Sequence, residues 1–209
     1  VILQTLGISI TPIITALGVG GLAVALALQD TLANLFAGIR ILASGKLRPG
    51  DFVRLETGQE GMIEDITWAQ TTIRQQPNNV VIVPNAKLST AITTNFSLPD
   101  IEQSVPVTLG VSYASDLEQV ERVTLEVARE VLRGAEGGVA GFEPAVRFHT
   151  FGESSIQLTV VLRVMGYENR AIVIHEFIKR LHKRYAAEGI EIPFPIRTVR
   201  MERDAKETS

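Results

Sequence analysis

The sequence predicts a membrane protein in three parts: a transmembrane helix, a small all-β domain and an α+β domain. First, of the 20 basic and 23 acidic residues, only Asp30 and Arg40 lie within the first 45 positions. Second, five short apolar runs with turn residues between them occupy residues 51–96. Third, strand and helix patterns follow over residues 103–201 in the order β-α-β-β-α-β, which is typical of a ferredoxin-like domain.

The overall composition excludes several classes of protein. The 209 residues include no cysteine, which excludes disulfides, Cys-ligated zinc, iron–sulfur clusters and thiol catalysis. The formal net charge of −3 argues against a dedicated nucleic-acid-binding protein, which is normally basic. Because the chain begins at Val1 rather than Met, we expect it to be the C-terminal part of a longer protein.

The first predicted helix is the uncharged run at residues 12–29, and we expect residues 1–6 to end an earlier helix. Eighteen residues at a rise of 1.5 Å span roughly 27 Å, close to the hydrocarbon thickness of a bilayer. A signal peptide would need a basic N-terminal region, which is absent. A buried core helix is the other alternative, since 18 residues is short for a span, but the lack of any polar face favours the membrane. Arg40, Lys46 and Arg48 follow the run, which places the soluble body in the cytoplasm by the positive-inside rule.

Small residues form two neighbouring stripes along this helix at spacings of three and four. One stripe holds Gly18, Gly21 and Ala25, and the other holds Thr15, Val19 and Ala23. Small residues let helices approach closely in lipid, so two stripes allow each helix to contact two identical neighbours in a ring. A single dimer contact, or docking in a larger bundle, would use the same spacing.

Leu22 and Leu26 are four residues apart and therefore lie on one face of the helix. On the inside of a ring they would form two stacked apolar collars. Such a constriction blocks ions by dewetting and opens when the ring widens. Contact with lipid or with other helices is the ordinary alternative for a leucine.

A second helical pattern occupies residues 31–44, and Gln29 and Asp30 separate it from the first. We expect Asp30 to be the N-cap of this second helix, which would place a kink there. A ring of Asp30 carboxylates at the cytoplasmic pore mouth would also attract cations.

The soluble body divides into two patterns. Strands are predicted at residues 51–55, 60–67, 70–74, 80–83 and 91–96, with a helical turn at 85–88, as in a small twisted barrel or sandwich. Beyond residue 98, strands are predicted at 103–113, 145–151, 156–165 and 196–201. Asp116 and Asn169 are the predicted N-caps of two helices that end at Gly134 and Gly189. Residues 202–209 are polar and expected to be disordered.

A search for an active site finds little. His175 and His182 are seven residues apart, too far for a His-x-x-x-His metal pair. Glu64 and Asp65 are neighbours on a predicted strand and point to opposite faces. No phosphate-binding loop or Gly-x-Ser-x-Gly motif occurs. We therefore expect no enzyme, no catalytic residue, no metal and no cofactor.

Segments throughout the chain resemble the small-conductance mechanosensitive channel (MscS) family. They include Gly-Gly-Leu-Ala-Val-Ala-Leu-Ala-Leu-Gln-Asp at residues 20–30 and Val-Ile-Val-Pro-Asn-Ala-Lys at residues 81–87, with further matches at 46–53, 61–66, 71–74, 95–97 and 192–195. The resemblance implies a homoheptamer in which membrane tension opens a weakly selective pore, releasing ions and small solutes on hypo-osmotic shock. It implies a multi-pass protein of the cell membrane, the bacterial inner membrane, in contact with lipids.

The resemblance also assigns parts of the chain. It implies the end of a preceding membrane helix, the pore helix and a kinked interfacial helix at 1–44, an Sm-like β domain at 45–97, a ferredoxin-like cytoplasmic domain at 98–201 and a tail at 202–209. Leu22 and Leu26 would seal the pore. Gly18, Gly21 and Ala25 would pack against Thr15, Val19 and Ala23. The last strand would join a seven-stranded barrel.

Three departures from the family pattern stand out. Asp30 occupies the position where the best-known member has a kink glycine, whereas Gly38 matches a second family glycine and offers an alternative bend. Ala25 replaces a packing glycine, and Gln76-Pro-Asn-Asn replaces the usual Asp-Gly hairpin.

Two other functions compete with a channel. The first is a membrane-tethered Sm-like binding or scaffold module, whose Arg48, Arg54 and Arg74 would contact nucleic acid or a partner. Aromatic stacking residues are scarce in that segment and acidic residues are interleaved, which argues against nucleic acid. The second is an enzyme acting on a membrane substrate, for which the sequence offers no site.

Overall fold

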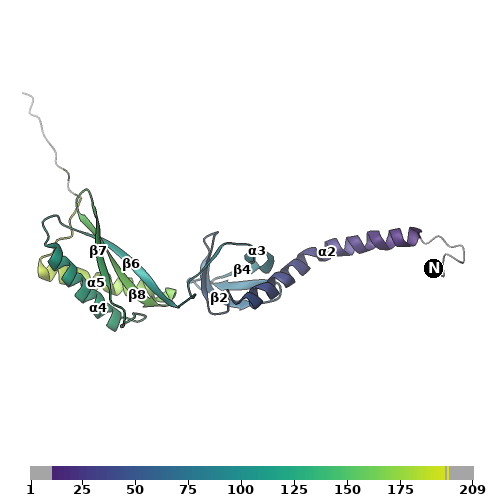
Figure 1. Cartoon of the computed structure of the whole chain (residues 1–209), viewed down its shortest axis with the longest axis horizontal. Helices are drawn as coiled ribbons and strands as arrows, with labels where there is room; N and C mark the ends of the chain where they lie inside the picture. The colour runs from purple at the N-terminus through teal and green to yellow at the C-terminus, as the bar shows by residue number, and fades with distance from the viewer. Residues whose placement is uncertain (1–10, 196, 198–209) are drawn as a thin grey trace, which may run out of the picture. The chain divides into compact units, whose positions relative to one another are not determined.

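The computed structural model describes residues 11–195 and 197 (Figure 1). They fall into two compact units, Val1–Leu98 and Pro99–Ser209. The fold class is as predicted: an apolar N-terminal helix, then a β domain, then an α+β domain. The expected helix end at 1–6, the tail at 202–209 and all but one residue of the expected strand at 196–201 lie outside the described residues.

One continuous helix, α2 (Thr11–Ser44), replaces the two helices that the sequence suggested. Gln29 and Asp30 lie inside it, so the prediction that Asp30 is an N-cap is wrong. An N-cap needs non-helical backbone, and no glycine or proline near Asp30 favours a break. An aspartate in a helix interior costs less than about 0.7 kcal/mol, whereas starting a new helix requires a new, unfavourable nucleus. The helix is also unbroken at Gly38.

The first unit contains a five-stranded antiparallel sheet in the order β4-β3-β2-β1-β5. Its elements are β1 (Phe52–Leu55), β2 (Glu60–Ile66), β3 (Gln70–Arg74), β4 (Val80–Pro84), helix α3 (Asn85–Leu88) and β5 (Thr93–Asn95). These strands form a single sheet, not the two packed sheets of a sandwich. The core consists of buried side chains of the sheet and α3 together with Ile41 of α2. The C-terminal half of α2 is therefore part of this domain.

The second unit has a three-stranded antiparallel sheet in the order β6-β8-β7, and two helices pack against one face of it (Figure 1). Its elements are β6 (Glu102–Val111), α4 (Leu117–Gly134), β7 (Ala145–Phe151), β8 (Ile156–Met165), the 3-10 turn η1 (Tyr167–Asn169) and α5 (Arg170–Glu188). This is the β-α-β-β-α part of the predicted ferredoxin-like order.

The helix ends of the second unit test three sequence predictions. Asp116 caps α4 as predicted, because its Oδ1 accepts from the backbone N–H groups of Glu118 (2.9 Å) and Gln119 (3.3 Å). Gly189 ends α5 as predicted, in the left-handed conformation at φ 69°. Asn169 occupies the N-cap position of α5, as predicted, but its side chain makes no cap hydrogen bond. Its Nδ2 donates instead to the Met165 carbonyl (2.5 Å).

Tyr185 and Thr124 give the second unit a measurable pH dependence. The Tyr185 hydroxyl lies 2.6 Å from Thr124 Oγ1 in the core between α5 and α4. Burial raises the pKa of Tyr185, and the hydrogen bond with Thr124 opposes that rise only in part. The unfolded tyrosine therefore ionises first. The stabilisation is full below the unfolded pKa of about 10 and is lost as the pH rises through the folded pKa.

We expect the melting temperature of the second unit to fall more steeply above about pH 10 in the wild type than in Tyr185→Phe. At neutral pH the variant should lose about 1 kcal/mol of stability, the typical net value of one hydrogen bond. Tyr113→Phe is the matched control, because the Tyr113 side chain is half exposed and its hydroxyl donates to the Gly152 carbonyl. Equal alkaline slopes in wild type and Tyr185→Phe would contradict this account.

Candidate pore helix and its anchor

The first 19 residues of α2 make no buried contact in the described chain. Every residue from Thr11 to Gln29 is exposed, and Leu22 and Leu26 each expose 62% of their surface. By length and composition this helix can cross a membrane. A helix that is apolar all round and uncovered requires lipid or other protein around it.

The continuous helix aligns three predicted site residues. Leu22, Leu26 and Asp30 follow one another at intervals of four, so they form one row, with Gln29 beside it. Gly18 precedes Leu22 in the same row, Gly21 and Ala25 border the row on one side, and Ala23 borders it on the other. The row therefore changes from apolar to acidic within one turn. The expected break at Asp30 would have separated its carboxylate from the two leucines.

The glycines of this segment pack against no other part of the described structure. A Cβ atom added at Gly18, Gly20 or Gly21 would meet nothing within 4 Å. A glycine in a helix interior costs about 1 kcal/mol relative to alanine. Their small size therefore serves no contact with the described residues, and it suits a close approach by another helix. The hydroxyl hydrogen of Thr15 is already used, because its Oγ1 donates to the Thr11 carbonyl (2.9 Å).

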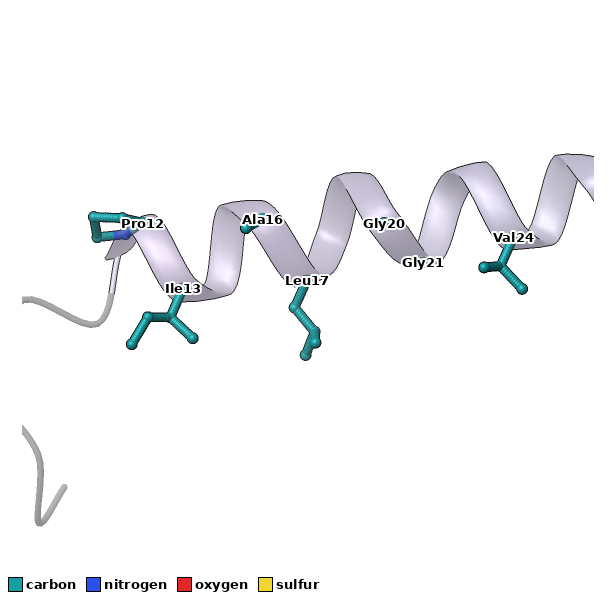
Figure 2. Close-up of a pocket in the computed structure, with 7 residues that line it drawn as sticks. All are labelled: Pro12, Ile13, Ala16, Leu17, Gly20, Gly21 and Val24. Atoms are coloured by element: carbon teal, nitrogen blue, oxygen red, sulfur yellow. The ribbon is translucent and has the colours of Figure 1, made fainter.

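An apolar groove runs along residues 12–24 of the helix (Figure 2). By helical spacing it lies on the side opposite Leu22 and Leu26. Ile13, Leu17 and Val24 project to one side of it, while Gly20 and Gly21 leave the backbone bare (Figure 2). The helix thus presents a leucine row to one side and a hollowed apolar surface to the other.

The C-terminal half of α2 is fixed to the β domain by close packing. Ala37, Gly38 and Ile41 are buried there. A Cβ atom at Gly38 would lie 2.6 Å from Asn85 Nδ2 and 3.0 Å from the Trp68 carbonyl oxygen. Gly38 is therefore required for the close approach of α2 to the β domain. The sequence had suggested a bend at this glycine instead.

Two polar side chains of α2 hold both ends of the short helix α3. Asn34 Oδ1 accepts from the Ala86 backbone N–H (2.9 Å) at its start, and Arg40 Nη2 donates to the Ser89 carbonyl (2.8 Å) at its end. These contacts satisfy backbone groups that a helix terminus leaves open. The sequence analysis did not predict these contacts: it used Arg40 only for membrane orientation and did not single out Asn34, although a polar side chain inside an otherwise apolar helix is a usable signal.

Buried Asn85 continues this connection into the sheet. Its Oδ1 accepts from Thr71 Oγ1 (2.9 Å), and its Nδ2 donates to the Thr67 carbonyl (2.8 Å). Both Asn85 and Thr71 are fully buried. One hydrogen-bonded unit is thus formed by the C-terminal half of α2, the helix α3 and the β2–β3 turn, and we call it the anchor.

Comparison with known protein families covers almost the whole chain. Three consecutive family models match it: mechanosensitive ion channel, transmembrane helices 2/3, at residues 1–29; mechanosensitive ion channel, beta-domain, at 30–98; and mechanosensitive ion channel MscS, C-terminal, at 105–192. The chain belongs to the MscS family of mechanosensitive channels. It is therefore a membrane protein, as the sequence predicted.

Individual MscS relatives agree with this assignment. The chain is 32% identical to the small-conductance mechanosensitive channel MscMJ of Methanocaldococcus jannaschii over 204 residues, 97% of this chain and 57% of the relative. It is 34% identical to the large-conductance channel MscMJLR of the same organism over 209 residues, 97% of this chain and 56% of the relative. The chain thus spans about half the length of the curated relatives it matches.

A solved MscS structure has the same fold. The crystal structure of Helicobacter pylori MscS in its closed state matches with a TM-score of 0.76 and 28% identity, covering 97% of this chain and 78% of that chain. Arabidopsis thaliana MSL1 matches with a TM-score of 0.64 at 21% identity, which supports the fold alone.

Proposed function

We propose that this chain is the pore-forming part of a mechanosensitive channel subunit, which opens under membrane tension and releases ions and small solutes on hypo-osmotic shock. One observation carries the proposal. Residues 11–29 of α2 are uncharged and exposed and bear a leucine row and small-residue stripes, and the C-terminal half of the same helix is anchored to a folded domain. The names of the MscS relatives support the same activity.

In the proposed homoheptamer, the stripe of Gly18, Gly21 and Ala25 packs against Thr15, Val19 and Ala23 of the next subunit. Leu22 and Leu26 then face the axis and form two apolar collars. A narrow apolar constriction expels water, so it blocks ions without a solid plug. Tension widens the ring, the collars separate and the pore fills with water.

The anchor sets how the helix moves in this scheme. Because Gly38, Asn34 and Arg40 fix the lower half of α2 to the β domain, residues 11–29 are the part that is free to tilt. The close contact at Gly38 resists separation of helix and domain. Opening therefore displaces the collars relative to a fixed base.

We also propose a multi-pass topology with the C-terminal body in the cytoplasm. Residues 1–29 match the model of transmembrane helices 2/3, which supports a preceding membrane helix. Arg40, Lys46 and Arg48 follow the span, and an excess of basic residues marks the cytoplasmic side.

Asp30 lies in the leucine row and is the proposed carboxylate ring at the pore mouth. We expect Asp30→Asn to shift the reversal potential in a salt gradient toward the anion equilibrium potential, because the ring no longer concentrates cations. Asp30→Glu, which keeps the charge, should not. Since Asp30 is not a cap, neither change should lower stability by more than a few tenths of a kcal/mol. An unchanged reversal potential in Asp30→Asn would remove Asp30 from the permeation path.

A membrane-tethered module that binds nucleic acid is the second candidate, and the arginines of the β domain argue against it. Arg54 pairs with Glu60 (2.5 Å), Arg74 pairs with Glu64, and Arg48 Nε donates to the Gly45 carbonyl (3.1 Å). Arginines engaged in this way are poorly placed to neutralise phosphates. Salt-dependent binding of RNA or DNA by the protein would favour this candidate.

A flux assay tests the proposed channel. Liposomes that contain the full-length protein and a self-quenched anionic dye should release the dye within seconds of hypo-osmotic dilution, and retain it on isotonic dilution. Protein-free liposomes diluted in the same way are the control. Equal release with and without the protein would contradict the proposal.

A further inference from the structure

The two helices of the second unit each have a side that is turned away from the other helix. They lie side by side on one face of the sheet (Figure 1), where Glu126 of α4 pairs with Arg184 of α5 (2.9 Å) and Thr124 Oγ1 lies 2.6 Å from the Tyr185 hydroxyl. These contacts fix which side of each helix faces its neighbour. The proposed channel mechanism makes no use of the two outer sides.

The outer side of α4 carries two glutamates and a leucine in one row. Glu118, Glu121 and Leu125 follow one another at intervals of three and four. Glu126, which contacts α5, lies about 100° round the helix from Leu125 and about 140° from Glu121, so the row is turned away from α5. The row lines a groove of about 340 Å³.

This groove on α4 is acidic. The two arginines that also line it are engaged, because Arg122 pairs with Glu126 (3.4 Å) and Arg129 pairs with Glu143. The two glutamates of the row form no ion pair with any described residue. Their charge is therefore available to a partner.

The outer side of α5 carries a matching row. His175, Ile178 and His182 have the same spacing of three and four, and all three side chains are exposed, Ile178 by 52%. Arg184, which contacts α4, lies about 120–180° round the helix from them, so this row is also turned away from the other helix.

No carboxylate of α5 is available to this row. Glu176 pairs with Lys179 (3.1 Å) and Arg180 (3.5 Å), and Glu188 pairs with Arg184 (2.9 Å). An imidazole has an N–H group that can donate to a carboxylate whether the ring is neutral or charged. The row therefore offers two donors with an exposed isoleucine between them.

We propose that the acidic row of one subunit binds the histidine row of the next. Ile178 enters the groove beside Leu125, and the two imidazoles donate to Glu118 and Glu121. One chain cannot make this contact by itself, because its two rows lie on opposite sides of the helical layer. A second copy of the chain satisfies both rows, with an apolar contact at the centre and hydrogen bonds between donors and carboxylates around it.

This contact is head-to-tail, because it joins unlike surfaces of the two copies. A head-to-tail contact that repeats around a closed rotation generates a ring. The inference rests on the proposed homo-oligomer, to which it adds a contact between the C-terminal units, and not on gating.

Chemical crosslinking of the full-length protein tests the contact. The 209 residues contain no cysteine, so thiols can be introduced singly once any cysteine elsewhere in the full-length protein has been replaced by serine. Glu121→Cys/Ile178→Cys places a thiol at the centre of each row, and a short bismaleimide should convert it into a ladder of covalent oligomers on a denaturing gel. Each single variant should stay monomeric, because the contact brings unlike positions together.

Glu130→Cys/Ile178→Cys is the matched control, because Glu130 is also an exposed glutamate of α4 but lies about 180° round the helix from Glu121. It should remain monomeric. Adding Glu118→Lys to the crosslinking pair should lower the yield of covalent oligomer about threefold, since it replaces an attraction between exposed groups by a repulsion. Adding Glu130→Lys should leave the yield unchanged.

Native electrophoresis of the same samples separates this inference from the proposed channel. An oligomer that gives no covalent ladder with Glu121→Cys/Ile178→Cys would overturn the contact and leave the channel proposal intact. A ladder from either single variant would indicate a contact between like surfaces and would also overturn it. A protein that is monomeric on the native gel would contradict both the contact and the proposed homo-oligomer.

Discussion

Leu26→Ser should make the pore conduct without applied tension. In the proposed ring the wild-type collar stays dry because leucine side chains line it, and wetting one leucine side chain costs about 2 kcal/mol. In a ring, that cost is repeated in every subunit. A serine hydroxyl instead stabilises water in the constriction, so the closed state becomes permeable to ions. Single-channel recording at zero tension should show frequent openings, and cells that express the variant should grow poorly.

Leu17→Ser is the control for this effect. Leu17 belongs to the same helix and is also exposed, but it lines the apolar groove (Figure 2). By helical spacing this groove lies opposite the leucine row. It should gate like the wild type. Leu22→Ser should behave like Leu26→Ser, with both collars contributing. Wild-type gating in both Leu22→Ser and Leu26→Ser would show that these leucines do not form the seal.

Gly38→Ala should destabilise the first unit by about 1–3 kcal/mol, the usual cost of overpacking. The added methyl group would lie 2.6 Å from Asn85 Nδ2 and 3.2 Å from the Thr67 carbonyl oxygen. To make room, α2 must move away from α3 or Asn85 must lose its hydrogen bonds. The direction of the change in stability is diagnostic, because Gly→Ala at an exposed helix position would stabilise the helix by about 1 kcal/mol.

Thermal denaturation in detergent measures this effect. Gly141→Ala adds the same methyl group where nothing lies within 4 Å, and its melting temperature should match the wild type. Gly38→Ala should melt several degrees lower. A melting temperature equal to or above that of the wild type would show that the helix does not depend on this contact.

The sequence predicted most elements because their signals are local. Alternating apolar residues predicted the strand Ala145–Phe151, and the cap at Asp116 predicted the start of α4. Asp30 and Asn169 are both good cap residues whose side chains make no cap hydrogen bond: Asp30 lies inside a helix, and Asn169 stands at the N-cap position but bonds elsewhere. At Asp30 the apolar period continues on both sides, and at Asn169 a 3-10 turn intervenes.

The same distinction holds for the candidate site. The faces of the pore helix follow from helical periodicity, so the row of Leu22 and Leu26 and the stripes beside it could be predicted. The anchor depends on residues far apart in the chain: Asn34 meets Ala86 across 52 positions, and Arg40 meets Ser89 across 49. No local pattern shows which residue lies opposite Gly38. The sequence suggested a bend at Gly38, whereas the structure shows that Gly38 lies in close contact with Asn85.

Patch-clamp recording of the full-length protein in liposomes tests the central claim most directly. Suction applied to an excised patch should evoke discrete currents at a reproducible tension, with weak selectivity between cations and anions. Patches without the protein should stay silent up to rupture. If patches that contain the protein, verified in the same membranes by immunodetection, are equally silent, the chain does not form a tension-gated channel.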